Sequence, residues 1–415
     1  MKKWIKLIAM TMVLATFFVG CANTQSPNTN ATESATSAPN TLPAEPRTLK
    51  IGDVDISQYK IVYAMNADKQ AIMQSNDMPL KEYWDDAYDA EKQTALRLAE
   101  IIKTYLGVEL DVGVDLSVVD SKYEILIGAT NRSESQEAAE ATTLSIDEYE
   151  IKLIGNRLVV RGGTHGAMYH ALDALEEMLK TDENGRNHTI TESKPIKGSY
   201  HLTRVAVIGD SISQGYSATN KEFNSYVPTT GRIHWKDHVV YNYGLTSTTM
   251  RSDLADSYQN SQQWADLRAN TEKYDVVLIM LGTNDSNRIW KTGAAWGTAD
   301  DTAYISSASV IIDTVLAHSP NAEIVIMSCP VYYGEKEFGS ARVRTLQKSI
   351  ADTLKSEDYK IHFFDMYSYT VEHLPREMLP DDLHPNNAGH YQMAKGVAAM
   401  LQALAEGKTS QYLLY

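Results

Sequence analysis

A serine that directly follows an apolar run is the first residue of this sequence that could do chemistry. The run "VAVIG" ends in Gly209-Asp210-Ser211, and a small polar segment follows it. Asp and Ser at such a place often cap a helix, so each residue alone predicts only a strand-to-helix turn. A serine hydroxyl becomes a nucleophile when a neighbouring base removes its proton. Ser211 is therefore a candidate nucleophile that needs partners elsewhere in the chain.

Two later segments supply candidate partners for Ser211. The segment "PDDLHPNN" carries Asp381 and, three residues further on, His384. His384 can accept the serine proton and later protonate the leaving group, while Asp381 can hold the imidazole in one tautomer and stabilise its charged form. The segment "LGTND" supplies the Asn284 amide. This amide, the Ser211 N–H and a backbone N–H of the "YNYGLTS" segment can together stabilise an oxyanion. These residue types predict acyl transfer.

The elements that must position these residues follow a strand–helix repeat over residues 201–407. The predicted strands are "RVAVIG", "HVVYNYG", "DVVLIMLG", "AEIVIMS" and "KIHFF". The predicted helices cover residues 251–270, 302–318, 340–357 and 387–406. Apolar runs without alternation indicate strands that are buried on both faces of a sheet, so we expect an α/β domain with a doubly wound, parallel, five-stranded sheet. Ligands bind at the carboxyl ends of such strands, where the candidate residues lie.

The four segments, in this order over residues 203–392, resemble the conserved blocks of the GDSL/SGNH hydrolase family. The resemblance implies a flavodoxin-like fold, with Ser211 as the nucleophile, His384 as the base, Asp381 as its partner and Asn284 as an oxyanion donor. It also implies that the enzyme needs no metal and no cofactor. The serine does not lie in a Gly-x-Ser-x-Gly elbow, which separates the chain from the larger α/β-hydrolase class.

The second block departs from the family pattern. The family has Asn-x-x-x-x-Gly here, and the glycine gives an oxyanion N–H; counting from Asn242, that place holds Ser247. A serine keeps this N–H if the local φ allows it. We therefore expect Ser247 to be the backbone donor, with Gly244 supporting the turn and standing as the alternative. Asp382 also stands where the family often has glycine, which adds negative charge near His384.

The N-terminal residues 1–21, "MKKWIKLIAMTMVLATFFVGC", have a basic start, a short apolar core and small residues before a cysteine. They resemble a bacterial lipoprotein signal, with Phe18 where leucine is usual, and the resemblance implies lipidation of Cys21. A plain secretory signal or an uncleaved anchor is the alternative. Residues 22–47 are rich in Ser, Thr, Asn and Pro, which predicts a disordered tether. We expect a protein anchored by lipid to the outer face of a bacterial cell membrane.

A first folded region over residues 48–182 is predicted to be a smaller α+β domain. It contains a helical pattern over residues 83–106, a hairpin that turns around Gly155-Asn156, and a second helix after Gly162-Gly163. This order resembles the small domain that precedes the catalytic module in alpha-glucuronidases and related hexosaminidases, which implies an accessory role. Two glycines before a helix indicate an anion site weakly and a turn more often. Residues 183–200 are predicted to be a linker, and residues 408–415 a C-terminal tail.

The composition restricts the partners. The net charge is −15, which disfavours nucleic acid and anionic lipid as ligands. Cys329 ends an apolar run and is expected to be a buried, inert thiol. Trp290 and Trp296 lie after a strand end, where core packing is the more common role and a sugar-stacking platform is the alternative. The oligomeric state is not indicated.

These observations predict a serine esterase that hydrolyses short acyl esters, most simply O-acetyl groups on a carbohydrate. A lipase or lysophospholipase is an alternative, but it would need an apolar acyl groove. An acyltransferase is another, because an alcohol can replace water in attacking the acyl-enzyme. A non-catalytic, glycan-binding envelope lipoprotein is the alternative from a different class, and the departure at Ser247 is its only support.

Overall fold

The computed structural model describes residues 47–66, 85–181, 186–291, 295–334, 340–354 and 359–414. The predicted signal sequence with Cys21, and the tether up to residue 46, lie outside these residues. Residues 46–415 form one compact unit, which contains two folded domains. No helix among the described residues combines the length and the apolar character needed to cross a bilayer.

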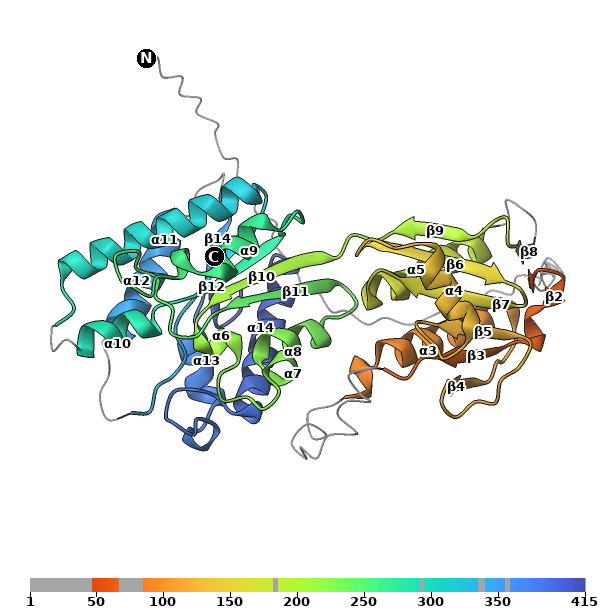
Figure 1. Cartoon of the computed structure of the whole chain (residues 1–415), viewed down its shortest axis with the longest axis horizontal. Helices are drawn as coiled ribbons and strands as arrows, with labels where there is room; N and C mark the ends of the chain where they lie inside the picture. Colours follow the sequence, from red (N-terminus) through yellow and green to blue (C-terminus); the bar gives the residue numbers. More distant parts are fainter. Residues whose placement is uncertain are drawn as a thin grey trace, which may run out of the picture. The chain divides into compact units, whose positions relative to one another are not determined.

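The second domain is built on a sheet with the strand order β11-β10-β12-β13-β14-β15 (Figure 1). Its five parallel strands are β10 (Thr203–Gly209), β11 (His238–Gly244), β12 (Val276–Met280), β13 (Glu323–Met327) and β14 (Ile361–Phe364). The sheet thus confirms the predicted α/β fold class. A sixth strand, β15 (Leu413–Leu414), pairs antiparallel with β14. It lies in residues predicted to be a tail, and two residues are too few to carry a strand pattern.

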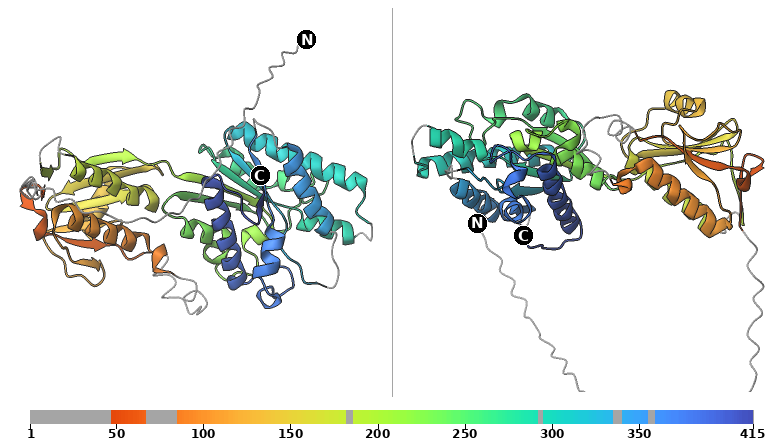
Figure 2. Two further views of the ribbon diagram at one scale, coloured as in Figure 1. Left: turned by 180° about the vertical axis from the view of Figure 1, so that it is seen from behind. Right: turned by 90° about the horizontal axis from the view of Figure 1, so that it is seen from below.

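Helices cover both faces of this sheet (Figures 1 and 2). One face packs against α9 (Gln262–Ala269), α11 (Thr298–His318) and α12 (Ser340–Leu354). The other face packs against α8 (Tyr226–Ile233), α13 (Met366–His373) and α14 (Asn387–Ala405). Strand β10 supplies both cores, because Ala206 and Ile208 point to the first face and Val205 and Val207 to the second. This explains why its sequence is apolar without alternation.

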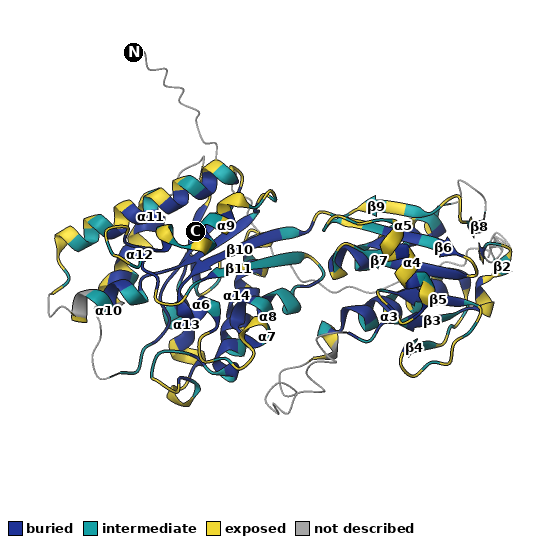
Figure 3. Cartoon of the chain, viewed as in Figure 1, coloured by how far each residue is buried: buried dark blue, intermediate teal, exposed yellow. Residues whose placement is uncertain are grey.

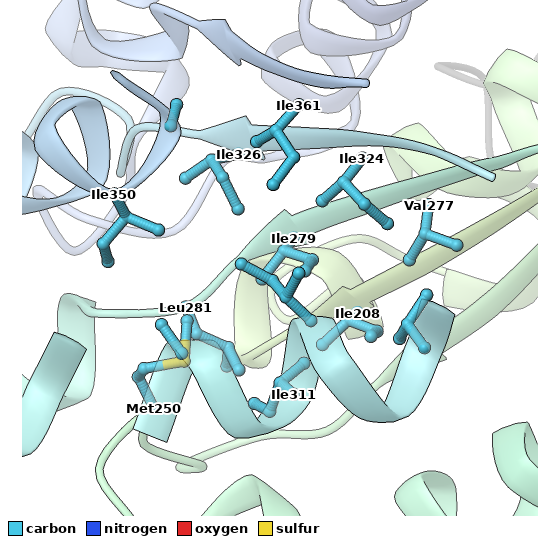
Figure 4. Packing of buried hydrophobic residues seen from close by; sticks show 14 of the residues in the cluster. Ile208, Met250, Val277, Ile279, Leu281, Ile311, Ile324, Ile326, Ile350 and Ile361 are labelled. Carbon is cyan, nitrogen blue, oxygen red and sulfur yellow. The ribbon is translucent and has the colours of Figure 1, made fainter. Parts of the chain in front are cut away.

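The buried side chains form a continuous layer on each face of the sheet. In Figure 4, Ile279, Ile324 and Ile208 of three neighbouring strands face Ile311 of α11. Figure 3 shows β10 and β12 buried between the helices, whereas the edge strand β11 has intermediate exposure. Fully burying one such side chain is worth about 1.5–3 kcal/mol. The rigid sheet that results holds the strand ends in register.

Among the predicted helices of the second domain, the largest difference in bounds lies at α9. Residues 251–270 were expected to form one helix, but α9 begins only at Gln262, where the Ser261 side chain accepts the N–H of Trp264. The preceding residues form a loop that ends in a short 3-10 helix, η3 (Tyr258–Asn260). Two short helices, α6 (Ser211–Gln214) and α10 (Thr283–Lys291), begin at the carboxyl ends of β10 and β12.

The first domain contains a mixed sheet with the order β4-β3-β5-β7-β6-β9. The strands are β3 (Lys60–Tyr63), β4 (Val112–Val114), β5 (Glu124–Ile127), β6 (Glu148–Ile154), β7 (Arg157–Gly162) and β9 (Ile196–Ser199). Strands β4, β3, β5 and β7 are parallel, and β6 and β9 add antiparallel pairs. Helices α3 (Ala90–Leu106) and α5 (His165–Lys180) pack on one face, and α4 (Ser133–Ala141) packs on the other. A smaller sheet joins β2 (Val54–Asp55), β1 (Thr48–Ile51) and β8 (Asn187–Ile190).

The predicted linker over residues 183–200 is corrected by the structure. Strand β8 pairs with β1, and β9 pairs with β6, so this segment supplies edge strands to both sheets of the first domain. Its composition is polar because β9 exposes alternate residues to solvent. The hairpin around Gly155-Asn156 is confirmed, since β6 and β7 flank these two residues.

Candidate active site

The predicted nucleophile lies at the turn between β10 and α6. The Asp210 side chain caps α6 by accepting the N–H of Ile212 at 3.1 Å. Ser211 is the first residue of the helix, so its own N–H has no partner within that helix. The Ser211 side chain is buried. A strand end followed at once by a helix thus holds both the hydroxyl and the N–H of one residue at the carboxyl edge of the sheet.

The structure brings Ser211, His384 and Asp381 together in one hydrogen-bonded chain. The Oγ of Ser211 lies 2.9 Å from Nε2 of His384. The Nδ1 of His384 lies 2.6 Å from Oδ2 of Asp381. Nucleophile, base and orienting carboxylate therefore occupy the relative positions that a serine acyl-transfer reaction requires.

Asp381 is held in its charged form by its own loop. Its Oδ1 accepts the backbone N–H groups of Leu383 at 3.1 Å and of His384 at 2.7 Å. Burial favours the neutral acid, but the hydrogen bonds from the side chain and backbone of His384 outweigh it, so the pKa of Asp381 lies below its usual value. A charged Asp381 favours the tautomer of His384 that carries its proton on Nδ1 and leaves Nε2 to accept from Ser211.

The backbone N–H groups of the second block differ in whether they have an acceptor within the described residues. The N–H groups of Gly244, Leu245 and Thr246 donate to Asn242 Oδ1, Gly209 O and Gln214 Oε1, respectively. No acceptor for the Ser247 N–H is present among the residues that the structure describes. This arrangement favours Ser247 over Gly244 as the oxyanion donor. A Cβ on Gly244 would lie 2.5 Å from the backbone N of Gln214, which agrees with a structural role for that glycine.

Ser247 has a φ of +62°, in the left-handed region that favours glycine. Ser247 thus keeps the left-handed backbone conformation that a glycine would adopt at this place. Asp382, the other predicted departure, has a φ of +65°. Its carboxylate forms a two-point ion pair with Arg376, at 2.7 and 3.0 Å. The charge that we expected Asp382 to add near His384 is therefore balanced by an arginine.

Asn284 and its neighbour fix the loop that carries Ser247. The Asn284 amide donates to the carbonyl of Thr248 at 3.0 Å, which uses one of its two N–H bonds. The fully buried Asp285 accepts the N–H groups of Met250 at 2.8 Å and Arg251 at 2.9 Å. Burial raises the pKa of Asp285 to about 6. Asp285 thus holds the loop of the second block in place.

Tyr216 is a feature of the site that the sequence did not indicate. Its ring lies 4.4 Å from the His384 ring, centroid to centroid, and half of the residue is exposed. The backbone N–H of Tyr216 donates to the carbonyl of Ser211. An exposed aromatic face therefore stands beside the base. No motif in the sequence links the two residues, because their contact depends on how the loop of His384 packs in the fold.

The remaining residues that the sequence analysis singled out, two tryptophans and a cysteine, lie outside the hydrogen-bonded chain of Ser211, His384 and Asp381. Trp296 packs against Tyr304 and donates to Asp301, so it belongs to the core of the second domain, and the side chain of Trp290 lies outside the described residues. Cys329 is buried as expected, and burial raises the pKa of its thiol to about 12. No group of three or more potential metal ligands occurs among the described residues.

Comparison with known families agrees with this geometry. Residues 207–392 match the model of the GDSL-like Lipase/Acylhydrolase family. This segment begins within β10 and ends within α14, so it contains the strand ends and the loop that hold the three hydrogen-bonded residues. Over residues 207–392, the second domain is therefore similar to this family of lipases and acylhydrolases.

Individual relatives are distant. An acetylxylan esterase of Xylanibacter ruminicola is 24% identical over 214 residues, and the match covers 48% of this chain and 43% of that protein. The chain thus spans less than half the length of this curated relative. A family two carbohydrate esterase from Clostridium thermocellum, solved with cellohexaose, is 18% identical with a TM-score of 0.38, covering 50% of this chain and 67% of that one. An aryl esterase of M. smegmatis is 17% identical with a TM-score of 0.38, covering 49% of this chain and all of that one.

Proposed function

We propose that this protein is a serine esterase that removes short acyl groups from a carbohydrate. The observation that carries the proposal is the hydrogen-bonded chain from Ser211 through His384 to Asp381. In the first step, Ser211 Oγ bonds to the carbonyl carbon of the ester and its proton passes to His384 Nε2. The resulting oxyanion is stabilised by the N–H groups of Ser211 and Ser247 and by the Asn284 amide.

The second half of the reaction restores the enzyme. The tetrahedral intermediate collapses, the bond to the alcohol oxygen breaks, and that oxygen takes the proton from His384. His384 then removes a proton from water, the water oxygen attacks the acyl-enzyme, and Ser211 recovers its proton as the acid leaves. Asp381 stabilises the charged imidazole in both halves.

Two observations support an acetylated glycan as the substrate. The acetylxylan esterase named above is a relative of this segment, and removal of acetyl groups needs no long acyl groove. The exposed ring of Tyr216 beside His384 offers an apolar face of the size of a pyranose ring. The acidic balance of the chain disfavours a substrate that is dense in phosphate or carboxylate.

The test compares the full chain with Ser211→Ala on p-nitrophenyl acetate, butyrate and octanoate, and on acetylated xylan. The control is Ser213→Ala, on the same short helix, whose Oγ lies 2.8 Å from the hydroxyl of Tyr226. We expect rates that fall with chain length, release of acetate from the polysaccharide, and a loss of at least about 10³-fold in Ser211→Ala alone. A preference for octanoate would indicate a lipid substrate and contradict the glycan. Equal rates in wild type and Ser211→Ala would refute the esterase.

We also propose that the enzyme acts at the outer face of a bacterial membrane, anchored through lipid on Cys21. The support is the sequence of residues 1–21, in which a basic start and an apolar core precede a cysteine. Incorporation of labelled palmitate into the wild type, and its loss in Cys21→Ala, would test the anchor. Equal labelling of both chains would refute it.

A further inference from the structure

The first domain contains a cavity that the esterase reaction does not use. Its volume is about 490 Å³, within the range of small-molecule sites. It is lined by the residues that follow β5 and β7, Gly128 and Gly163, and by the first turns of α3 and α5, with Glu91 and His165. The cavity therefore lies at the carboxyl edge of the parallel strands, where helices begin.

The cavity lies at the end of β5, one of the two strands between which the strand order of the sheet reverses. From β3 the chain passes through α3 to β4 on one side, and then returns to β5 on the other side of β3. Helix α3, which joins β3 to β4, and helix α4, which follows β5, lie on opposite faces of the sheet. A crevice forms at such a reversal, and this is the usual ligand position in open α/β sheets.

The charges around the cavity occur in pairs. The Glu91 carboxylate is buried and accepts from Asn66 Nδ2 at 2.8 Å, and it lies 3.0 Å from His165 Nε2. Arg161, which also lines the cavity, forms an ion pair at 2.9 Å with Glu150. Burial disfavours the charged form of Glu91, but the bonds from His165 and Asn66 outweigh it and lower its pKa.

A buried carboxylate at this place argues against an anionic ligand. The start of α5 would by itself favour an anion, and the preceding Gly162-Gly163 gave the same weak indication. An anion in the cavity would, however, face the charged Glu91. The remaining lining offers hydroxyl groups of Ser135 and Thr164 and the apolar surface of Met168. Paired charges, hydroxyl groups and apolar patches suit a ligand that donates and accepts hydrogen bonds without carrying charge.

We infer that this cavity is a second carbohydrate site, which binds a neutral sugar unit by hydrogen bonds to the Glu91–His165 pair. The sugar hydroxyls donate to Glu91 and accept from His165, while C–H faces of the ring pack on Met168. The site is separate from the triad, so the inference does not depend on the proposed esterase activity.

The test uses a substitution at the cavity lining that leaves the core intact. Ala139 of α4 lines the cavity and is exposed, so Ala139→Phe should obstruct the cavity without overpacking the domain. The matched control is Ala141→Phe, an exposed alanine at the end of the same helix that does not line the cavity. Both changes are made in the full chain with Ser211→Ala, so that turnover does not disturb binding. Calorimetric titrations use xylotetraose, cellotetraose and mannotetraose, with glucuronate and inorganic phosphate as anionic probes.

We expect at least one neutral tetrasaccharide to bind, with affinity at least tenfold weaker in Ala139→Phe and unchanged in Ala141→Phe. In the catalytically intact chain, Ala139→Phe should leave hydrolysis of p-nitrophenyl acetate unchanged, which separates this result from any failure of the esterase. Equal binding by both phenylalanine variants would place the sugar elsewhere and overturn the inference. So would the absence of binding by all three tetrasaccharides at millimolar concentration, or binding of the anions alone.

Discussion

Replacing Ser247 with glycine should stabilise the second domain and leave its activity nearly unchanged. Ser247 is exposed and adopts a φ of +62°. A residue with a Cβ pays about 1–2 kcal/mol in this left-handed region. Glycine avoids this strain but loses about 0.5–1 kcal/mol more backbone entropy on folding. The difference predicts that Ser247→Gly raises the free energy of unfolding by about 0.5–1 kcal/mol, and by no more than about 1.5 kcal/mol.

The activity of Ser247→Gly should stay within about threefold of wild type, because the proposed oxyanion donor is the backbone N–H and glycine retains it. Urea unfolding measures stability, and initial rates on p-nitrophenyl acetate measure activity. Ser306→Gly is the matched control, because Ser306 is exposed inside α11 without a positive φ, and there glycine should cost about 0.5 kcal/mol. Ser247→Ala removes only the hydroxyl, so its activity should also match the wild type.

Two results would refute this reasoning. If Ser247→Gly lowers the free energy of unfolding as much as Ser306→Gly does, the left-handed backbone at residue 247 carries no strain. If Ser247→Ala lowers kcat more than tenfold while Ser247→Gly lowers it equally, the hydroxyl of Ser247 takes part in the reaction. The backbone N–H would then not be the contribution of this residue.

Two further predictions concern the third block. Asn284→Ala removes one proposed oxyanion donor and should lower kcat by about 10²–10³-fold with a smaller effect on KM; steady-state rates check this, and an unchanged kcat would exclude the amide from the reaction. Asp285→Asn tests the buried carboxylate, whose pKa of about 6 in the folded state lies above its ordinary value of 3.8. A raised pKa contributes stability that is complete below pH 3.8 and is lost as the pH rises through 6. In urea titrations, the free energy of unfolding of the wild type relative to Asp285→Asn should therefore fall between pH 4 and pH 7. A constant difference would show that Asp285 does not titrate in that range.

The sequence predicts the second domain well because its signals are local and strong. Strands β10, β12 and β13 are buried and appear as runs rich in Val and Ile, whereas β14 is marked by Ile and Phe, and the half-buried edge strand β11 by Val and Tyr. Strand β9 carries no such run, because it is an edge strand that exposes alternate residues. The late start of α9 at Gln262 has a different cause, since the residues before it are held by Asp285 and by the ion pair of Arg251 with Asp253 rather than by helical bonds. Such contacts depend on the tertiary fold.

Part of the candidate site could also be predicted from the sequence, and part of it could not. Residue type and spacing along the chain predicted the partners of Ser211. In the structure, His384 lies within hydrogen-bonding distance of Ser211, and Asp381 lies within hydrogen-bonding distance of His384. The φ of Ser247 and the ring contact of Tyr216 with His384 could not be predicted, because they depend on backbone torsion and on long-range packing.

His384 and Asp381 lie on a single loop, whereas Ser211 lies 173 residues away from His384 in the sequence. Asp381 and His384 are joined by both side-chain and backbone hydrogen bonds, so their mutual geometry is local and survives movement of the loop as a whole. The distance between Ser211 and His384 depends instead on how the loop before α14 packs against α6. Catalytic turnover is therefore a sensitive reporter of that packing. During gentle denaturation, activity should vanish as soon as the loop loosens, before circular dichroism detects any loss of helix or sheet.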